Sequence, residues 1–158
     1  MSADAQSAEK PGTVVVRETR RGTFQQEIIV GSHHLLADEP ANVGGLDSGP
    51  GPYALLLTAL GACTSMTLRL YAERKKLPLT RTTVRLRHSR IYATDCAECE
   101  IKEGMLDRIE RVITLEGDLS VDDRKRLLEI ADKCPVHRTL TSEIDIRTTE
   151  ESGQSAAR

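Results

Sequence analysis

The feature that most constrains this chain is a long uncharged segment near its middle. No charged residue occurs from Ser48 to Leu68, and residues 53–72 contain no proline and a single glycine. Apolar side chains in this segment cover nearly every direction of a helical wheel, at Leu55, Leu56, Leu57, Ala59, Leu60, Ala62, Cys63, Met66, Leu68 and Leu70. A helix that is apolar all round is either a membrane span or a helix buried in the centre of a protein.

The polar residues inside the segment decide between these two interpretations. A membrane span needs about 20 mostly apolar residues. Here the apolar character is interrupted at Thr58, Gly61, Thr64, Ser65 and Thr67. We therefore predict a buried central helix with Pro52 near its first turn, and no membrane association. Because 158 residues are few to surround such a helix, a second copy of the chain is expected to cover part of it.

Composition excludes other classes of protein. With a net charge of −2 and 3% aromatic residues, the chain lacks the positive charge and the stacking side chains that nucleic-acid binding uses. Residues 1–12 and 149–158 are small and polar, so we expect a flexible tail at each end of one domain, residues 13–148. The first residues lack the apolar stretch of a secretory signal, which favours a cytoplasmic location.

Strand patterns lie on both sides of the predicted helix. A strand-like run opens at Val14 and ends at the turn of residues 20–22; further strands are expected at residues 24–30 and 34–37, before a Gly- and Pro-rich loop at 38–52. Two long strands follow, residues 82–92 and 106–116, with a polar loop between them. Ile109, Ile113 and Leu115 share one face of the second strand, and Arg111 stands among them as an unexpected charge.

The last third of the chain predicts helices and a final strand. Residues 120–123 have the spacing of a capping box, although with Asp at its last position. The helix that follows presents Leu127, Leu128, Ile130 and Ala131 to a core and ends near Lys133. After residues 136–140 we expect a strand with Ile144 and Ile146 pointing inward. Strands, helix, strands, helix and strand make an α+β fold.

Cys134 directly precedes Pro135, a residue that favours the first position of a helix, so we expect Cys134 at or beside an N-cap. There, backbone N–H groups and the positive end of the helix dipole favour a thiolate. His137 and Arg138 follow within one turn and add positive potential. The alternative is an ordinary capping residue with a solvent-facing His and Arg.

Cys63 is either an inert core residue or, if Cys134 faces it, a partner in redox chemistry.

Cys96 and Cys99 form a single C-x-x-C in an acidic loop. A structural zinc site needs four ligands, and this motif supplies two, with His88 as a candidate third. A redox C-x-x-C usually opens a helix after a strand, which this loop does not resemble. We expect no metal and keep metal binding by these three residues as an alternative hypothesis.

Two runs carry a resemblance to a known family. Residues 49–67 (GPGPYALLLTALGACTSMT) look like the central helix of the OsmC-like family, which includes the osmotically inducible protein C and the organic hydroperoxide resistance proteins. Residues 131–140 (ADKCPVHRTL) resemble its second cysteine motif, and residues 95–100 look like a feature of one branch of it. The resemblance extends from about residue 14 to residue 148.

The resemblance implies antiparallel sheets wrapped around the central helix in an intertwined homodimer. It also implies a thiol peroxidase that needs no cofactor. Cys63 would reduce a hydroperoxide and become a sulfenic acid, and Cys134 would close a disulfide with it. A dithiol reductant of the lipoyl or thioredoxin type would reopen that bond. The apolar surroundings of Cys63 suit an organic hydroperoxide.

One position departs from the family pattern. Peroxidase members typically carry an acidic residue near the start of the central helix, paired with an arginine from the N-terminal strands. Here Tyr53 and Ala54 stand at that place, and Arg17, Arg20 and Arg21 are the candidates for the arginine. The alternative function is therefore a redox sensor or binding protein that keeps the fold and turns over slowly.

Overall fold

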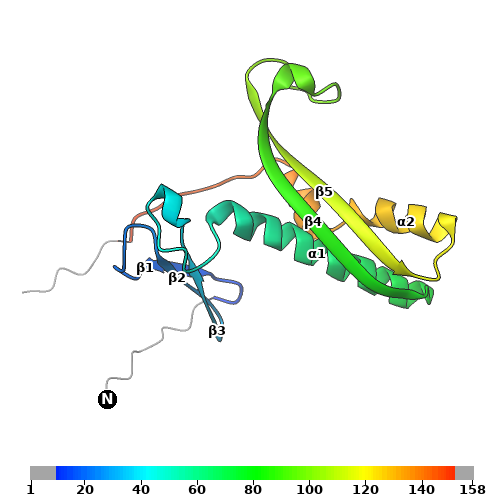
Figure 1. Ribbon diagram of the computed structural model, residues 1–158, viewed down its shortest axis with the longest axis horizontal. Helices are drawn as coiled ribbons and strands as arrows, with labels where there is room; N and C mark the ends of the chain where they lie inside the picture. Colours follow the sequence, from blue (N-terminus) through cyan, green and yellow to red (C-terminus); the bar gives the residue numbers. More distant parts are fainter. Residues whose placement is uncertain (1–9, 152–158) are drawn as a thin grey trace, which may run out of the picture. The chain divides into compact units, whose positions relative to one another are not determined.

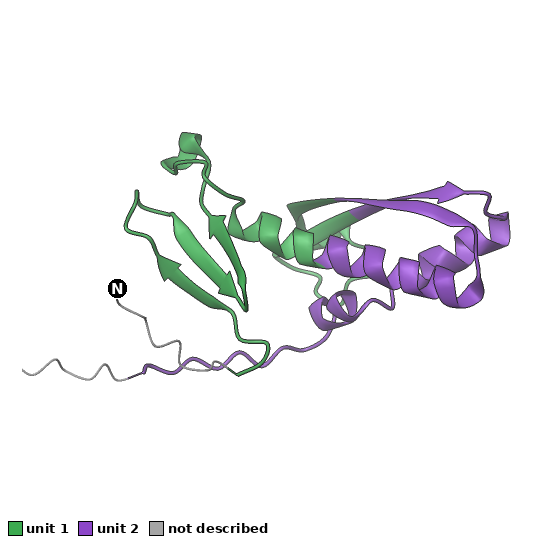
Figure 2. Ribbon diagram, turned by 90° about the horizontal axis from the view of Figure 1, so that it is seen from below, with its two compact units in different colours: residues 1–59, 86–110 green, residues 60–85, 111–158 purple. Residues whose placement is uncertain are grey.

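The computed structural model describes residues 10–151. Most of the two expected tails lies outside this range, so the tails and the single domain at 13–148 stay predictions. Contacts within the chain define two compact units, drawn in separate colours in Figure 2. The first comprises the residues up to 59 together with 86–110, and the second comprises residues 60–85 together with those from 111 onward.

The first unit contains a three-stranded antiparallel sheet with the strand order β1-β2-β3. Its strands are β1 (Val15–Glu18), β2 (Gln26–Val30) and β3 (His33–Ala37). Val16 and Leu35 both lie opposite Ile28, the buried residue at the middle of the central strand. The three strands expected before residue 38 are confirmed.

A polar network orders the loop that follows β3 and contains the 3-10 turn η1 (Ala41–Val43). The buried carboxylate of Asp38 accepts the Ser48 hydroxyl at 2.7 Å and the Leu46 N–H at 3.1 Å. The hydrogen bond from Ser48 is the main cause that lowers the pKa of Asp38 below its ordinary value. The backbone also comes so close here that a Cβ at Gly49 would overlap the carbonyl group of Leu36, which explains a glycine in this loop.

Helix α1 (Pro52–Lys75) begins at the expected proline and gives residues to both units. One stripe of it is buried, formed by Leu60, Thr64, Leu68 and Ala72 at a spacing of four residues. Among the described residues the other faces of α1 are partly or fully exposed, and Met66 is 71% exposed. A single chain therefore does not surround the helix, and its cover by a second copy stays a prediction. α1 is long and apolar enough to cross a membrane. The core helices of other proteins can have the same length and composition, so this finding alone is weak evidence for a span.

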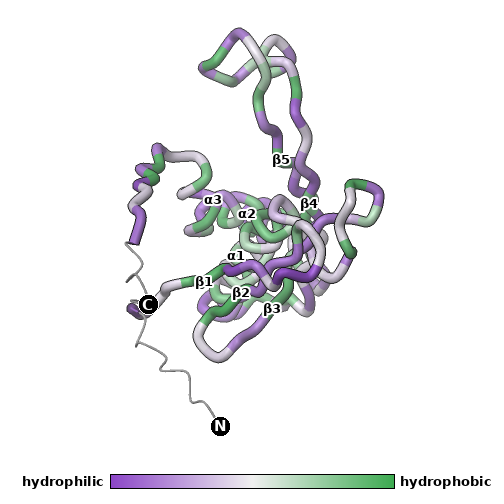
Figure 3. Tube along the Cα trace, turned by 90° about the vertical axis from the view of Figure 1, so that its left-hand side faces the viewer, coloured by the Kyte–Doolittle hydropathy of each residue, from purple (hydrophilic) through white to green (hydrophobic). Residues whose placement is uncertain are grey.

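A long hairpin joins β4 (Leu79–Tyr92) to β5 (Met105–Gly117) through the 3-10 turn η2 (Ala93–Asp95) and an irregular loop. Hydrophobic and hydrophilic residues are interspersed along the hairpin (Figure 3), and more buried and more exposed positions alternate over much of both strands. Gly117 is the last residue of β5 and has a φ of +133°. A Cβ at this position would overlap the carbonyl oxygen of Pro78.

The second unit is built on an apolar core between α1, the hairpin and α2 (Val121–Ala131), which Figure 1 shows lying side by side. The core residues are Leu68, Ala72, Leu79, Leu115, Leu119, Leu127, Ile130 and Ala131. The capping box of α2 is confirmed, since the Ser120 hydroxyl accepts from the Asp123 N–H and the Asp123 carboxylate accepts from the Ser120 N–H. Leu128 is 47% exposed, so its predicted inward position is wrong.

The end of the described chain differs from its prediction. After α3 (Pro135–Leu140), residues 143–151 have no regular structure, and Ile144 and Ile146 are exposed. The predicted final strand is therefore wrong for the single chain, because a strand forms only where a neighbouring strand pairs with its backbone. The α+β class is confirmed.

Candidate functional site

Thr64 brings the middle of α1 into contact with the C-terminal helices. Its side chain is fully buried, and its hydroxyl donates to the Leu60 carbonyl oxygen at 2.8 Å. The same Oγ1 lies 3.7 Å from Sγ of Cys134. Cys63, half-buried, is the preceding residue of the helix. The two cysteines, 71 positions apart, thus lie on segments of the second unit that touch.

Cys134 is the N-cap of α3, as predicted, with Pro135 at the first helical position. Its thiol is fully buried, and Sγ accepts the backbone N–H of His137 at 3.3 Å. A sulfur in this position replaces one of the acceptors that the first turn of a helix lacks. Both Cys63 and Cys134 are free thiols, which is the reduced form of the predicted pair.

Arg111 completes this cluster, and sequence reasoning did not include it among the site residues. Its guanidinium donates through one terminal nitrogen to Thr64 Oγ1 at 3.0 Å and to the Ala131 carbonyl oxygen at 3.3 Å. The other terminal nitrogen donates to Asp132 Oδ1 at 2.6 Å. The side chain is 12% exposed. The sequence signal was its place on the apolar face of β5, where a charge has to find buried polar partners.

The other residues expected near Cys134 contribute less. The His137 ring lies 3.8 Å from Asp132 Oδ1, a distance at which it pairs only when protonated. Arg138 is exposed, and its backbone N–H donates to the Cys134 carbonyl oxygen at 3.1 Å. Arg138 therefore adds positive charge near Cys134, and among residues 10–151 neither side chain forms a hydrogen bond with the sulfur.

The three N-terminal arginines belong to the first unit, on or beside its sheet. Arg17 donates to Glu27 Oε2 at 2.7 Å, and this hydrogen bond, with a second one from His34, lowers the pKa of Glu27. Arg20 pairs with Glu18 at 3.6 Å. The Arg21 backbone N–H donates to the Thr19 hydroxyl at 3.2 Å. Their side chains are exposed, and a role for any of them toward Cys63 stays a prediction.

Tyr53, which the sequence resemblance places at the expected position of an acid, packs on His88. The two rings are stacked, with centroids 4.3 Å apart and planes 11° from parallel. His88 Nε2 also lies 2.8 Å from Asp107 Oδ1. All three residues belong to the first unit. His88 is therefore engaged by an aromatic ring and a carboxylate.

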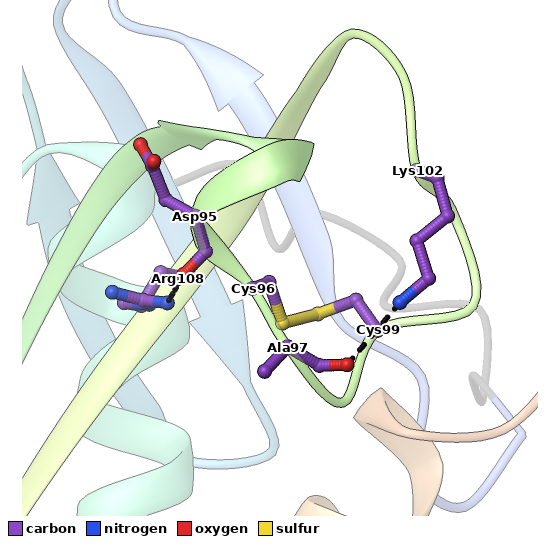
Figure 4. Close-up of a disulfide and its surroundings, with 6 residues drawn as sticks. All are labelled: Asp95, Cys96, Ala97, Cys99, Lys102 and Arg108. Atoms are coloured by element: carbon purple, nitrogen blue, oxygen red, sulfur yellow. Dashed lines mark hydrogen bonds between the residues drawn. A yellow bond between two sulfur atoms is a disulfide. The ribbon is translucent and has the colours of Figure 1, made fainter.

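Cys96 and Cys99 are joined in a disulfide, shown in Figure 4. Lys102 Nζ donates to the Ala97 carbonyl oxygen at 3.2 Å, and Arg108 donates to the Asp95 carbonyl oxygen at 3.4 Å. Sulfurs that are bonded to each other are not thiolate ligands. Residues 10–151 contain no group of three His, Cys, Asp or Glu side chains placed to hold a metal ion. The alternative of metal binding by Cys96, Cys99 and His88 therefore does not fit this structure.

Solved structures of similar fold come from several bacteria. An OsmC-like protein of Mycoplasma pneumoniae is 23% identical, with a TM-score of 0.60 over 84% of this chain and 88% of the other. For an organic hydroperoxide resistance protein OsmC of Legionella pneumophila the identity is 21%, the TM-score 0.59 and the coverage 84% and 90%. For the organic hydroperoxide resistance protein OhrB of Bacillus subtilis these values are 19%, 0.56, 84% and 92%. At such identities the likeness shows the fold.

No curated protein matches the sequence. The family model of the OsmC-like proteins matches residues 45–149. These residues include α1, the hairpin, both cysteine motifs and the Arg111 cluster. The matched segment is well over half of the chain. The protein therefore belongs to the OsmC-like family.

Proposed function

We propose that the protein is a thiol-dependent peroxidase that reduces organic hydroperoxides with Cys63 and Cys134. The observation that carries this proposal is the contact between Thr64, next to Cys63 on α1, and the sulfur of Cys134. The organic hydroperoxide resistance proteins of similar fold support the same class of substrate. The apolar residues that surround Cys63 in the sequence of α1 suit an organic group better than a polar one.

The proposed cycle has three steps. The Cys63 thiolate attacks the terminal oxygen of the hydroperoxide, the O–O bond breaks, and an alcohol leaves after taking up a proton, so that Cys63 becomes a sulfenic acid. Cys134 then attacks the Cys63 sulfur, the S–O bond breaks, and hydroxide leaves with the thiol proton as water. An external dithiol, of the lipoyl or thioredoxin type, reduces the disulfide by exchange and is itself oxidised. Such a cycle suits the cytoplasm, where dithiol reductants are kept reduced.

We also propose that two chains associate around α1. The exposed residues of this helix include Leu56, Met66 and Leu70, and those of the C-terminal segment include Ile144 and Ile146. Several exposed apolar side chains on one helix are typical of an interface, and residues 143–151 would gain strand partners in such a dimer. Light scattering checks this proposal: a mass near the 17.4 kDa of one chain at micromolar concentration would contradict it.

The second candidate is a redox sensor that oxidises readily and turns over slowly. Tyr53 favours it, because this residue stacks on His88 at the place where peroxidases of the family carry an activating acid. The two candidates differ in turnover. A sensor forms the Cys63–Cys134 disulfide once and keeps it in the presence of a dithiol, whereas a peroxidase consumes many equivalents of peroxide.

The test is consumption of tert-butyl hydroperoxide with dihydrolipoamide as the dithiol donor. We expect sustained turnover by the wild type and none by Cys63→Ser. The matched control is the double variant Cys96→Ser/Cys99→Ser, which removes the other two cysteines and should keep the wild-type rate. Equal turnover by the wild type and Cys63→Ser would end the peroxidase proposal, and one equivalent consumed by the wild type would favour the sensor.

A further inference from the structure

Arg111 is a half-buried cation, with a side chain 12% exposed, whose partners come from two different elements. β5 places it on the inward face, among Ile109, Ile113 and Leu115. Its guanidinium contacts Thr64 on α1 and, at the end of α2, the Ala131 carbonyl oxygen and the Asp132 carboxylate. A bonded guanidinium holds its partners in a fixed plane, because its donors form a rigid fork. Arg111 therefore fixes α1 relative to the end of α2 within the second unit.

The end of α2 is also the segment that carries Cys134. Asp132 is the C-cap of α2, and the Cys134 N–H donates to the Ala131 carbonyl oxygen at 3.3 Å. Arg111 thus holds the Asp132 carboxylate and the Ala131 carbonyl oxygen, which belong to the residues two and three positions before Cys134. Because Arg111 holds these groups against Thr64, it sets the distance between the Cys134 sulfur and α1. That sulfur lies 3.7 Å from Thr64 Oγ1.

The hydrogen bonds of Thr64 add a second link between Arg111 and the sulfur. Arg111 has only donors, so Thr64 Oγ1 accepts from it, and the single Thr64 proton goes either to the Leu60 carbonyl oxygen or to Cys134. When Cys134 is a thiol, its S–H can donate to Oγ1. When it is a thiolate, the Thr64 O–H can turn toward the sulfur while Arg111 keeps the oxygen in place.

We propose that Arg111 is a positioning residue for Cys134: through Thr64 and the end of α2 it holds the Cys134 sulfur beside the helical turn of Cys63, and so sets the rate at which these two cysteines close a disulfide. This inference rests on the proposed function for its place in the peroxidase cycle. The closing step itself is independent of the oxidant. In either case the Cys134 sulfur attacks an oxidised Cys63 sulfur, one S–S bond forms and the group on Cys63 leaves with two electrons.

The experiment measures closing in the full-length, pre-reduced protein with two oxidants. One is equimolar tert-butyl hydroperoxide, which gives the Cys63 sulfenic acid and then water. The other is diamide, which adds to a thiolate and leaves as the hydrazine after taking up two electrons and two protons. Rapid quenching with an alkylating agent and peptide mass spectrometry give the rate of the Cys63–Cys134 disulfide separately from that of Cys96 and Cys99. Dimedone labelling gives the Cys63 sulfenic acid.

The central variant is Arg111→Met, which keeps an unbranched side chain about as long as the aliphatic stem of arginine and removes the guanidinium donors. Its matched control is Arg124→Met. Arg124 lies in the first turn of α2 and also joins two elements, by donating to the carbonyl oxygens of Leu115 at 2.8 Å and Gly117 at 3.1 Å. It has no hydrogen bond to Thr64, Asp132 or Cys134 among the described residues. A merely structural effect of losing a half-buried arginine would appear in both variants.

We expect Arg111→Met to close the disulfide about ten- to a hundredfold more slowly than the wild type with both oxidants, because a misplaced sulfur loses the advantage of a nearby reactant. Its Cys63 sulfenic acid should form at the wild-type rate and then accumulate, with sulfinic acid appearing in excess peroxide. Arg124→Met should close within about twofold of the wild type. Equal closing rates of Arg111→Met and Arg124→Met would overturn the inference.

A second pair of variants applies if Arg111→Met does not fold. Thr64→Val keeps the shape and removes the hydroxyl, and Thr64→Ser restores it. We expect slow closing in the first and nearly normal closing in the second; the same rate in both would overturn the inference. A wild type that closes with diamide and not with hydroperoxide would contradict the proposed function alone, and the comparison of Arg111 with Arg124 would still be decided.

Discussion

The two pairs of cysteines in this chain come together in different ways. Cys96 and Cys99 are three positions apart in one loop, with Cα atoms 5.4 Å apart, and are bonded. Cys63 and Cys134 are 71 positions apart, on α1 and at the start of α3, and are free thiols. The first pair meets through local chain geometry. The segments that carry the second pair touch through Thr64 and Cys134 only when the second unit folds, so the proposed reaction depends on the fold.

The two pairs also differ in how much their surroundings hold the sulfur atoms. Cys96 and Cys99 are partly exposed in a loop that also carries Asp95 and Glu98. Cys134 is fully buried and touches the hydroxyl of Thr64 and the N–H of His137. A protein can control the orientation of a sulfur that packed groups hold, and has little control over one in an irregular loop. This difference supports the catalytic role that we propose for the distant pair.

The largest expected effect is the loss of multiple turnover in Cys134→Ser. This variant keeps Cys63, so one equivalent of hydroperoxide should still react. Without the internal thiol, the sulfenic acid must wait for an external one, and the loss of an intramolecular reaction should lower sustained turnover by at least about a hundredfold. Peroxide consumption with dihydrolipoamide measures it.

The control for this prediction is the double variant Cys96→Ser/Cys99→Ser, which should match the wild type. If that variant loses turnover and Cys134→Ser keeps it, the roles of the two pairs are reversed and the comparison is broken. A loss in both would mean that the loop disulfide takes part in the cycle, for example as an entry point for the reductant.

A second prediction concerns stability. If a disulfide acts by restricting the unfolded chain, closing over 71 positions stabilises the fold by about 4 kcal/mol and closing over three positions by about 2 kcal/mol. The variant Cys96→Ser/Cys99→Ser, oxidised with diamide, isolates the distant bond, and Cys63→Ser/Cys134→Ser isolates the near one. Urea unfolding of each variant, compared with its own reduced form, gives the two values. A near bond that stabilises as much as the distant one would contradict this ordering.

Local patterns in the sequence predicted the elements that position the cysteines. The uncharged run predicted the place of α1, the proline after Cys134 predicted the N-cap, and the spacing of Ser120 and Asp123 predicted the capping box. Each of these depends on residues within one or two helical turns. Alternation of polar and apolar residues likewise predicted β4 and β5.

Features that depend on partners distant in sequence were missed. Arg111 was recognisable as a charge on an apolar strand face, but its acceptors Thr64, Ala131 and Asp132 come from α1 and the end of α2. Ile144 and Ile146 have the alternation of a strand and no neighbouring strand to pair with in the described chain. Periodicity reveals which face of an element is apolar, and only the tertiary structure reveals what covers that face.

The smallest expected effect separates the structural role of Cys134 from its chemical one. Its sulfur accepts the His137 N–H as the N-cap of α3, and alanine cannot replace this acceptor, whereas serine can. Under reducing conditions, Cys134→Ala should therefore have a free energy of unfolding about 1 kcal/mol lower than Cys134→Ser.

The control is the same pair of substitutions at Cys96. There the hydrogen bond to the Ala93 carbonyl oxygen comes from the backbone N–H, which neither substitution changes. Cys96→Ala and Cys96→Ser should therefore be equally stable. Urea unfolding of the four variants measures both differences. A similar gap at both positions would mean that alanine and serine differ for reasons unrelated to capping, and that Cys134 is held in place by its packing and by Arg111 alone.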